Sequence, residues 1–276
     1  MMAGPAFLDR NMACWAMLAL FWVGCVGYRT PPQRNEVAEP VLNPGDSYLL
    51  VLGDDGSVNR YDSNTNSLFR RGAVSCAGQT PTSMSLGGMG SVYFSNSAGQ
   101  LCVTDLSLLS TRITPFNAAL VGHAVFGMAV AVEPDSGGET IYLAPSAGQY
   151  RKTLCRVDPA DWHIEPVGEI SAPTPYIELT QGLPNSLYAL AVGRNPAELL
   201  KVDSTQGVAI VLATVDQNPA AAVFALVYWQ GDVLLFLGSK GSGSSEMYRY
   251  AEGDSVVEAV ARVPLGIAGV GVARVP

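Results

Sequence analysis

The segment Leu199-Leu200-Lys201-Val202-Asp203 is repeated with variation at four other places in the chain. Its counterparts are Val58–Asp62, Leu101–Asp105, Leu154–Asp158 and Met247–Ala251. The copies begin at residues 58, 101, 154, 199 and 247, so they are separated by about 43 to 53 residues. Strand units with this period are typical of β-propellers, in which each repeat forms one blade of antiparallel strands. The sequence therefore predicts an all-β fold, a five-bladed β-propeller.

The residues around each copy predict the order of strands within a blade. A more apolar strand precedes it, namely Tyr48–Leu52, Val92–Phe94, Ile141–Ala144, Leu187–Val192 and Val233–Leu237. Apolar runs without alternation are expected of strands that are buried on both faces. A turn and an outer strand follow, as in Leu68–Arg70, His163–Glu165, Val208–Leu212 and Val256–Glu258. Each unit is expected to be a meander.

The innermost strands are expected to crowd the central axis, because they are rich in Gly, Ala, Ser and Met. Four such segments precede the apolar strands: Ser83–Leu86, Phe126–Val132, Tyr176–Leu179 and Val223–Tyr228. The first repeat has none, but residues 266–275 at the C-terminus have the same composition. Pairing of this C-terminal strand beside Tyr48–Leu52 would complete the first blade and remove the open edge. The predicted propeller spans residues 46–276.

The N-terminal part of the chain predicts export. Arg10 precedes the apolar run Met12–Gly24, which has the length of a signal-peptide core and is too short to span a bilayer. Residues 1–24 are therefore predicted to be a signal peptide. Trp22-Val23-Gly24-Cys25 resembles a bacterial lipobox, so Cys25 is expected to carry the lipid. Plain secretion and a retained anchor are the alternatives. Residues 25–45 contain four prolines and are expected to form an extended tether.

Composition restricts the partners. The formal net charge of −8 and the pI near 4.7 disfavour binding to nucleic acid, because the phosphate backbone would be repelled. The expected location is the bacterial cell envelope, with a lipid anchor in the outer or inner membrane, or outside the cell if Cys25 is unmodified. The expected partner is an envelope protein or a glycan, and the protein is expected to be a monomer.

The inner-strand segments also resemble a known group of proteins. Pro81–Met84, Phe126–Met128, Glu178–Thr180, Trp229–Asp232 and Gly266–Val272 are similar to signatures of uncharacterised exported β-propeller repeat proteins of myxobacterial type. The resemblance covers about residues 46–276. It implies a propeller fold and an envelope location, and it carries over no activity and no functional residues.

Three cysteines are expected to remain after export and lipidation: Cys76, Cys102 and Cys155. An odd number leaves at least one free thiol. Cys102 and Cys155 occupy equivalent positions in neighbouring repeats, too far apart for a disulfide. We expect all three to be small buried residues, with a Cys76–Cys102 bridge as the alternative.

Catalytic chemistry is not expected. Glycoside cleavage needs two cooperating carboxylates, yet the five equivalent inner-strand positions are Met84, Met128, Glu178, Leu226 and Val270. The divalent-ion ligands of propeller lactonases are missing as well. A hydrolase of glycosidase or lactonase type remains the alternative. No cofactor is predicted. No metal site is predicted either, because the calcium-like run Asp62–Asn66 lacks the later ligands and is interpreted as a hairpin turn.

A few polar and aromatic residues are candidates for ligand contact. Glu178, Thr180 and Gln181 lie on one inner strand, and His123 belongs to the entry loop of the preceding blade. The preferred interpretation of Glu178 is structural, as an acceptor of backbone or hydroxyl hydrogen bonds between blades, with ligand contact or catalysis as alternatives. The candidates for an aromatic contact surface are Tyr228, Trp229 and Trp162.

Basic residues recur two positions before the end of most copies. They are Arg60, Arg156, Lys201 and Arg249. Because the position repeats in four blades, we expect these side chains to pair with acidic neighbours and to serve the architecture.

Overall fold

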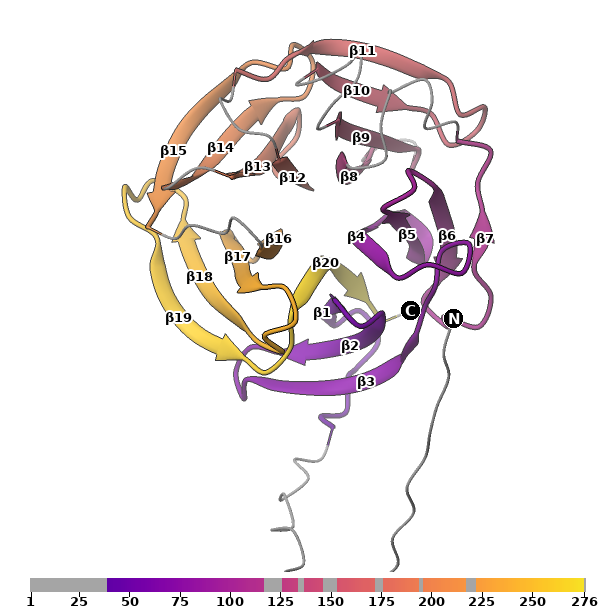
Figure 1. Cartoon of the computed structure of the whole chain (residues 1–276), viewed down its shortest axis with the longest axis vertical. Helices are drawn as coiled ribbons and strands as arrows, with labels where there is room; N and C mark the ends of the chain where they lie inside the picture. Colours follow the sequence, from indigo (N-terminus) through magenta and orange to yellow (C-terminus); the bar gives the residue numbers. More distant parts are fainter. Residues whose placement is uncertain are drawn as a thin grey trace, which may run out of the picture. The chain divides into compact units, whose positions relative to one another are not determined.

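The computed structural model describes residues 39–116, 126–133, 137–145, 153–171, 176–193, 196–216 and 222–275. These residues form five four-stranded antiparallel sheets arranged in a ring (Figure 1). The predicted five-bladed β-propeller is confirmed. Among the described residues, no helix has the length and apolar character needed to cross a membrane.

Four tiers of strands run from the axis outward. The innermost are β4 (Pro81–Leu86), β8 (Phe126–Val132), β12 (Tyr176–Gln181), β16 (Ala222–Trp229) and β20 (Ile267–Arg274). The second tier comprises β1 (Ser47–Gly53), β5 (Ser91–Asn96), β9 (Glu139–Pro145), β13 (Ser186–Val192) and β17 (Asp232–Ser239). The third comprises β2 (Ser57–Asp62), β6 (Leu101–Asp105), β10 (Thr153–Val157), β14 (Ala197–Asp203) and β18 (Ser245–Ala251). The outermost are β3 (Ser67–Ala73), β7 (Arg112–Ile113), β11 (Ile164–Glu169), β15 (Ala209–Val215) and β19 (Glu258–Val263).

The strands of the third tier are the repeated segments of the sequence. The recurring positions of these segments adopt the same local structure in most blades. Four of the five pairs between third and fourth strands carry a β-bulge at the equivalent place, after the first residue of the copy: Val58/Asn59, Leu154/Cys155, Leu199/Leu200 and Met247/Tyr248. Asp62, Asp105, Asp158 and Asp203 then accept hydrogen bonds from backbone N–H groups two residues ahead. The repeated Asp therefore caps the turn to the outer strand. The calcium-like run starting at Asp62 is such a hairpin turn, as expected.

The C-terminal strand closes the ring as predicted. β20 pairs antiparallel with β1 from Ser47↔Arg274 to Gly53↔Ile267, giving the sheet order β20-β1-β2-β3. The predicted bounds of one outer strand, Val256–Glu258, are wrong. Strand β19 begins at Glu258, after Val256 and Val257. The apolar residues Val256 and Val257 belong to the connection before the strand.

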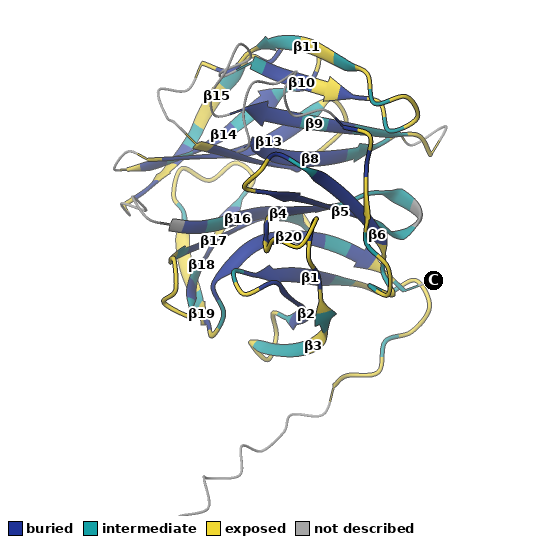
Figure 2. Ribbon diagram, turned by 45° about the vertical axis from the view of Figure 1, so that its right-hand side comes forward, coloured by how far each residue is buried: buried dark blue, intermediate teal, exposed yellow. Residues whose placement is uncertain are grey.

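The inner strands are buried and approach one another closely, whereas the outer strands face solvent (Figure 2). A Cβ added to Gly127 on β8 would lie 1.9 Å from the carbonyl oxygen of Ile177 on β12. A Cβ on Gly269 of β20 would lie 2.5 Å from the amide nitrogen of Met84 on β4. Such contacts are shorter than side chains tolerate, so glycine at these positions lets the inner strands meet around the axis.

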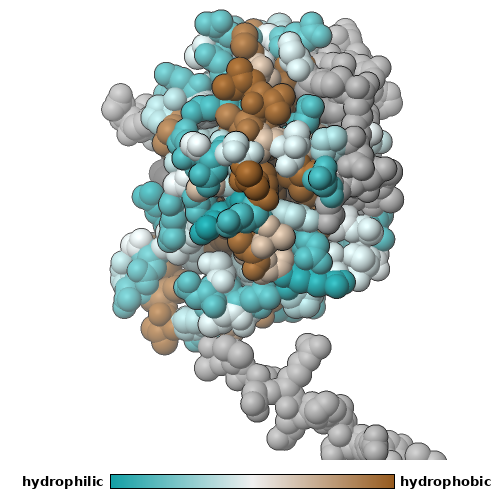
Figure 3. Space-filling model, turned by 90° about the vertical axis from the view of Figure 1, so that its left-hand side faces the viewer, coloured by the Kyte–Doolittle hydropathy of each residue, from teal (hydrophilic) through white to brown (hydrophobic). Residues whose placement is uncertain are grey.

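The outer rim is not uniformly polar. Figure 3 shows apolar side chains gathered in a band on the side of the propeller that carries β15 and β19. The exposed large apolar residues on these two strands or just before them are Val208, Ile210, Val211, Val256 and Val260.

A disulfide joins Cys76 to Cys102, with a Cα–Cα distance of 5.6 Å, and Cys155 is a free buried thiol. The expectation of three unpaired cysteines was therefore wrong, and the alternative bridge is the one present. Cys76 lies in the connection between β3 and β4, where a bridge to Gln79 turns the chain back. This turn brings the sulfur of Cys76 to that of Cys102 on β6.

Loss of this disulfide is expected to destabilise the propeller by about 3.5 kcal/mol, the loop-closure value for a sequence separation of 26 residues. Urea unfolding of the oxidised protein, of the reduced protein and of a Cys76→Ala/Cys102→Ala variant would measure it. The double variant should unfold near the reduced protein and should not respond to reductant. Equal midpoints for the oxidised and reduced protein would contradict the prediction.

The recurring basic residues pair with carboxylates, as predicted. The N–O distances are 3.0 Å for Arg60–Glu39, 2.6 Å for Arg156–Glu165, 2.9 Å for Lys201–Glu252 and 3.3 Å for Arg249–Glu258. Three of these pairs are substantially exposed, and such pairs contribute little to stability. Arg60 differs, because only 6% of its side chain is exposed.

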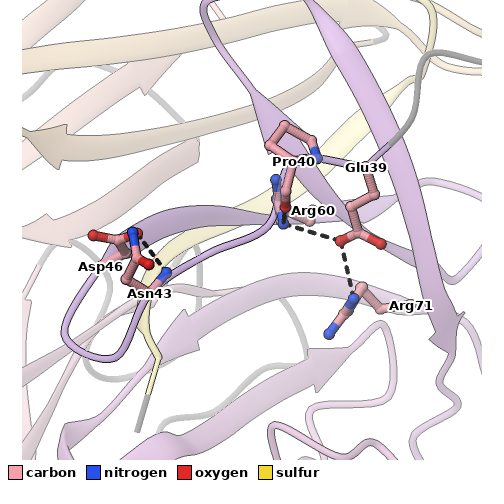
Figure 4. Close-up of polar contacts among 6 residues, drawn as sticks. All are labelled: Glu39, Pro40, Asn43, Asp46, Arg60 and Arg71. Atoms are coloured by element: carbon pink, nitrogen blue, oxygen red, sulfur yellow. Dashed lines mark hydrogen bonds and ion pairs between the residues drawn. The ribbon is translucent and has the colours of Figure 1, made fainter.

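Glu39 and Pro40, at the end of the predicted tether, lie on the first blade (Figure 4). The Glu39 carboxylate accepts hydrogen bonds from both Arg60 and Arg71 at 3.0 Å, and the Pro40 carbonyl accepts a second one from Arg60. Farther along, Gly45 N–H donates to Val275 O and Val275 N–H to Asp46 O. The described residues before β1 are thus bonded to the blade that β20 closes.

Candidate functional site

A cavity of about 890 Å³ lies where the inner strands end. All five inner strands contribute to its lining, together with the turn after β4 and the turn after β6. Strands that start around one axis and run in the same direction bring equivalent residues into one ring. The cavity is therefore the mouth of the central channel at the C-terminal ends of these strands.

Equivalent positions near the ends of the five inner strands line this mouth. The residues two positions beyond Met84, Met128, Glu178, Leu226 and Val270 are Leu86, Val130, Thr180, Tyr228 and Val272, and all five line the cavity. The lining also includes Ser85, Gln181 and the exposed Arg274. The described part of the mouth thus combines apolar side chains, neutral hydrogen-bonding groups, one aromatic ring, one guanidinium and the carboxylate of Asp105.

Thr180 and Gln181, two of the predicted contact residues, lie together in this lining. Gln181 is already engaged in part, because its Oε1 accepts a hydrogen bond from Val132 N–H at 3.3 Å. Its amide NH2 group provides donors on the same side chain. Tyr228 stacks on Tyr188 of the neighbouring blade with ring centroids 5.5 Å apart, which fixes the orientation of its ring.

Glu178 lies deeper and is not part of the lining. Its Oε1 accepts a hydrogen bond from the Ser83 hydroxyl at 2.7 Å and another from Met128 N–H at 3.4 Å. Ser83 belongs to β4 and Met128 to β8, so this one carboxyl joins three blades. The structure shows the hydroxyl and backbone hydrogen bonds between blades that the preferred interpretation of Glu178 required.

Burial controls the ionisation of Glu178. Removal from water raises the pKa of the carboxyl to about 8, while the hydrogen bonds from Ser83, Met128 and Leu179 act in the opposite direction. The group is therefore mostly protonated at neutral pH. A raised pKa suits a general acid, but this carboxyl lies outside the cavity and its Oε1 is occupied by Ser83 and Met128.

Side chains of neighbouring inner strands accept hydrogen bonds from the backbone N–H groups on the edge of β8 that faces the channel. Met128, Val130 and Val132 donate their N–H groups to Glu178 Oε1, Ser85 Oγ and Gln181 Oε1 respectively. An inner strand has a neighbour on only one side of its sheet, so these groups would otherwise be unpaired. The polar residues on the inner strands thus have a structural role in addition to any contact with a ligand.

Asp105 is the one carboxylate among the described residues that line the cavity. It accepts hydrogen bonds from the hydroxyl and the N–H of Ser107, which lower its pKa, the hydroxyl contributing most. Asp105 is therefore ionised at neutral pH and cannot donate a proton. A pair of carboxylates with the separate acid and base roles of a glycosidase is not present in this lining.

The remaining predicted residues do not join the site. Trp229 is partly buried against the core between the fifth and first blades and does not line the cavity. His123 lies outside the described residues, as does Cys25. Within the described ranges, no three His, Cys, Asp or Glu side chains are grouped so that they could hold a metal ion.

Sequence reasoning named Tyr228 only for an aromatic contact surface, and it placed neither Tyr228 nor Arg274 in this mouth. For Tyr228 the signal was present, because the inner-strand alignment that singled out Glu178 needed only to be continued by two residues, whereas Arg274 lies two residues beyond that position. A further blade contact was also missed: Tyr93 OH on β5 donates to Glu139 Oε2 on β9 at 2.6 Å. Glu139 packs so closely against Gly87 that a Cβ there would lie 2.3 Å from its Oε1.

Comparisons with known proteins identify the fold. No protein-family model and no curated protein matches the chain. Among solved structures, a chain from the crystal structure of a nidogen/laminin complex aligns with a TM-score of 0.54 at 9% identity, over 82% of this chain and 98% of that chain. TolB from Acinetobacter baumannii gives 0.48 at 9% identity over 79% and 53% of the two chains. Hydrazine synthase from Kuenenia stuttgartiensis gives 0.42 at 13% identity over 66% and 48%. At these identities the first similarity shows the fold alone, and the chain is a β-propeller.

Proposed function

We propose that this protein is a non-catalytic binding protein of the bacterial cell envelope, held by a lipid on Cys25, whose propeller is an interaction platform for a protein or a glycan. The proposed binding site is the mouth lined by Thr180, Gln181, Tyr228 and Arg274. The myxobacterial-type resemblance of the inner strands and the lipobox-like Trp22–Cys25 support the envelope location.

The observation that carries the non-catalytic part is the position of Glu178. It is the one carboxylate at the five equivalent inner-strand positions, and its Oε1 bonds Ser83 and Met128 away from the cavity. Asp105, the carboxylate in the lining, is held ionised by Ser107. The mouth is therefore proposed to bind a ligand without cleaving it, because hydrogen-bonding groups and an aromatic ring converge there without an acid–base pair.

The test compares wild type with Gln181→Ala/Arg274→Ala in the mouth and with Glu178→Gln outside it. Each full chain is expressed in a bacterium and extracted from the membrane fraction, where wild type should carry acyl mass on Cys25 and Cys25→Ser should not. Immobilised protein is then assayed against purified envelope glycans and envelope extracts. We expect Glu178→Gln to retain bound material like wild type and the mouth variant to lose it.

Enzyme assays provide the opposing outcome. Wild type and Glu178→Gln are incubated with chromogenic glycosides and lactones, and neither should turn them over. Turnover by wild type that disappears in Glu178→Gln would overturn the proposal in favour of a hydrolase. Equal retention of envelope material by wild type and the mouth variant would contradict the proposed binding site.

A further inference from the structure

Among the described residues, the outermost strand of each blade pairs with a strand on one side only, and β15 differs from the others in how its other edge is protected. Free edges pair with other strands unless charges, prolines or short length prevent it. β3 carries Arg70 and Arg71, β7 has only two residues, β11 carries Glu165, Pro166 and Glu169, and β19 carries Glu258 and Arg262. β15 reads Ala-Ile-Val-Leu-Ala-Thr-Val and has no such residue.

β15 also exposes large apolar side chains. The exposed fractions are 58% for Ile210 and 55% for Val211, and Val208 just before the strand is 55% exposed. On the fifth blade, Val256 is 64% exposed and Val260 43% exposed, and Figure 3 shows apolar groups on this side of the propeller. Contiguous exposed apolar surface beside an unprotected edge is typical of a contact surface rather than of a solvated rim.

We propose that β15 pairs antiparallel with β15 of a second copy of this chain, about a two-fold axis near Val211. The two fourth blades then form one continuous eight-stranded sheet. This inference is independent of the proposed function, because it concerns the rim and not the mouth. It departs from the monomer expected from the sequence.

The charge distribution along β15 favours a second copy as the occupant. With the axis at Val211, Ile210 lies opposite Leu212 and Val208 opposite Thr214. The nearest charged residue beyond the strand, Asp216, lies opposite Gln206 and far from its own counterpart. A net charge of −8 opposes association over most of the surface, but this pairing brings no like charges together.

The other outer strands do not fit this arrangement. Self-pairing of β3 would bring Arg70 and Arg71 of the two copies close together, and Pro166 interrupts β11. The chain's own N-terminal segment is also poorly suited to pair with β15. Residues 26–38 contain Pro31 and Pro32, which have no N–H group to donate to a neighbouring strand.

Sedimentation analysis of the full chain in detergent, from about 1 µM to about 1 mM, tests the proposal. Wild type should show a dimer that grows with concentration. Val211→Lys and Val211→Glu alone should each weaken the dimer at least about tenfold, because like charges then face each other. An equimolar mixture of the two variants should restore it, because Lys then faces Glu. Ile113→Lys is the matched control, since Ile113 is 56% exposed on the outer strand of another blade and should leave the dimer unchanged.

Melting temperatures equal to wild type establish that the variants are folded, and Ile210→Thr replaces any that is not. A wild type that stays monomeric throughout the range overturns the proposal, including the case in which it binds lipid vesicles through this band instead. Equal dimerisation of Val211→Lys and Ile113→Lys, or failure of the Lys and Glu variants to recover on mixing, overturns it as well.

Discussion

Deletion of residues 266–276 is expected to abolish cooperative folding of the propeller. β20 supplies the innermost strand of the first blade, and Ile267, Val270 and Ala273 are almost fully buried. Burial of these side chains and pairing with β1 together contribute about 5–10 kcal/mol, which is as large as the whole stability of an ordinary domain. We expect the truncated chain to aggregate, or to unfold at much lower urea with a broad transition.

A circular permutant is the matched control for this deletion. In it, residues 266–275 precede Gly45 and the chain ends at Leu265, so the same strand is joined directly to β1. The pairing Ser47↔Arg274 and the bond from Val275 N–H to Asp46 O place the two ends side by side, so a short connection suffices. Urea unfolding of the permutant should resemble that of residues 45–275 in their natural order, which lack the Arg60 partners Glu39 and Pro40 in the same way. A truncated chain that unfolds at the wild-type midpoint would contradict the closure argument.

The fold could be predicted from the sequence because the determining signals are local and repeated. The copies such as Leu199–Asp203, the apolar strands before them and the Gly-rich inner strands each recur in register. Closure by residues 266–275 followed from the same logic, since one inner strand was missing at the start and present at the end. The disulfide could not be predicted in this way, because Cys76 lies in an irregular connection whose path depends on tertiary packing.

The candidate site was only partly predictable. Alignment of the inner strands identified Glu178 and Thr180, but the depth of each residue along the axis depends on how tightly the strands approach. Contacts such as those at Gly127 and Gly269 set this distance and cannot be read from one strand at a time. As a result Glu178 lies within the packed ring, while Thr180, two residues farther on, lines the mouth.

The free energy of unfolding of wild type is expected to fall between pH 5 and pH 9 because of Glu178. Its pKa is about 8 in the folded protein against an ordinary value of 4.5, since burial disfavours the charged form. Below pH 4.5 the group is protonated in both states and its contribution to stability is complete. As the pH rises towards 8, the unfolded chain releases the proton while the folded protein retains it, and stability is lost. The loss over pH 5 to 9 is on the order of 4 kcal/mol.

Glu178→Gln isolates this effect, because glutamine has nearly the same shape, accepts the hydrogen bonds from Ser83 and Met128, and does not ionise. Urea unfolding at pH 5, 7 and 9 should show wild type losing on the order of 4 kcal/mol more than the variant across the range. At pH 9 the variant should therefore be the more stable of the two. Glu258→Gln on the exposed strand β19 is the control, and its curve should parallel that of wild type. Parallel curves for wild type and Glu178→Gln would show that the carboxyl already ionises in the folded ring, which would remove the physical basis for treating it as a buried, protonated link between blades.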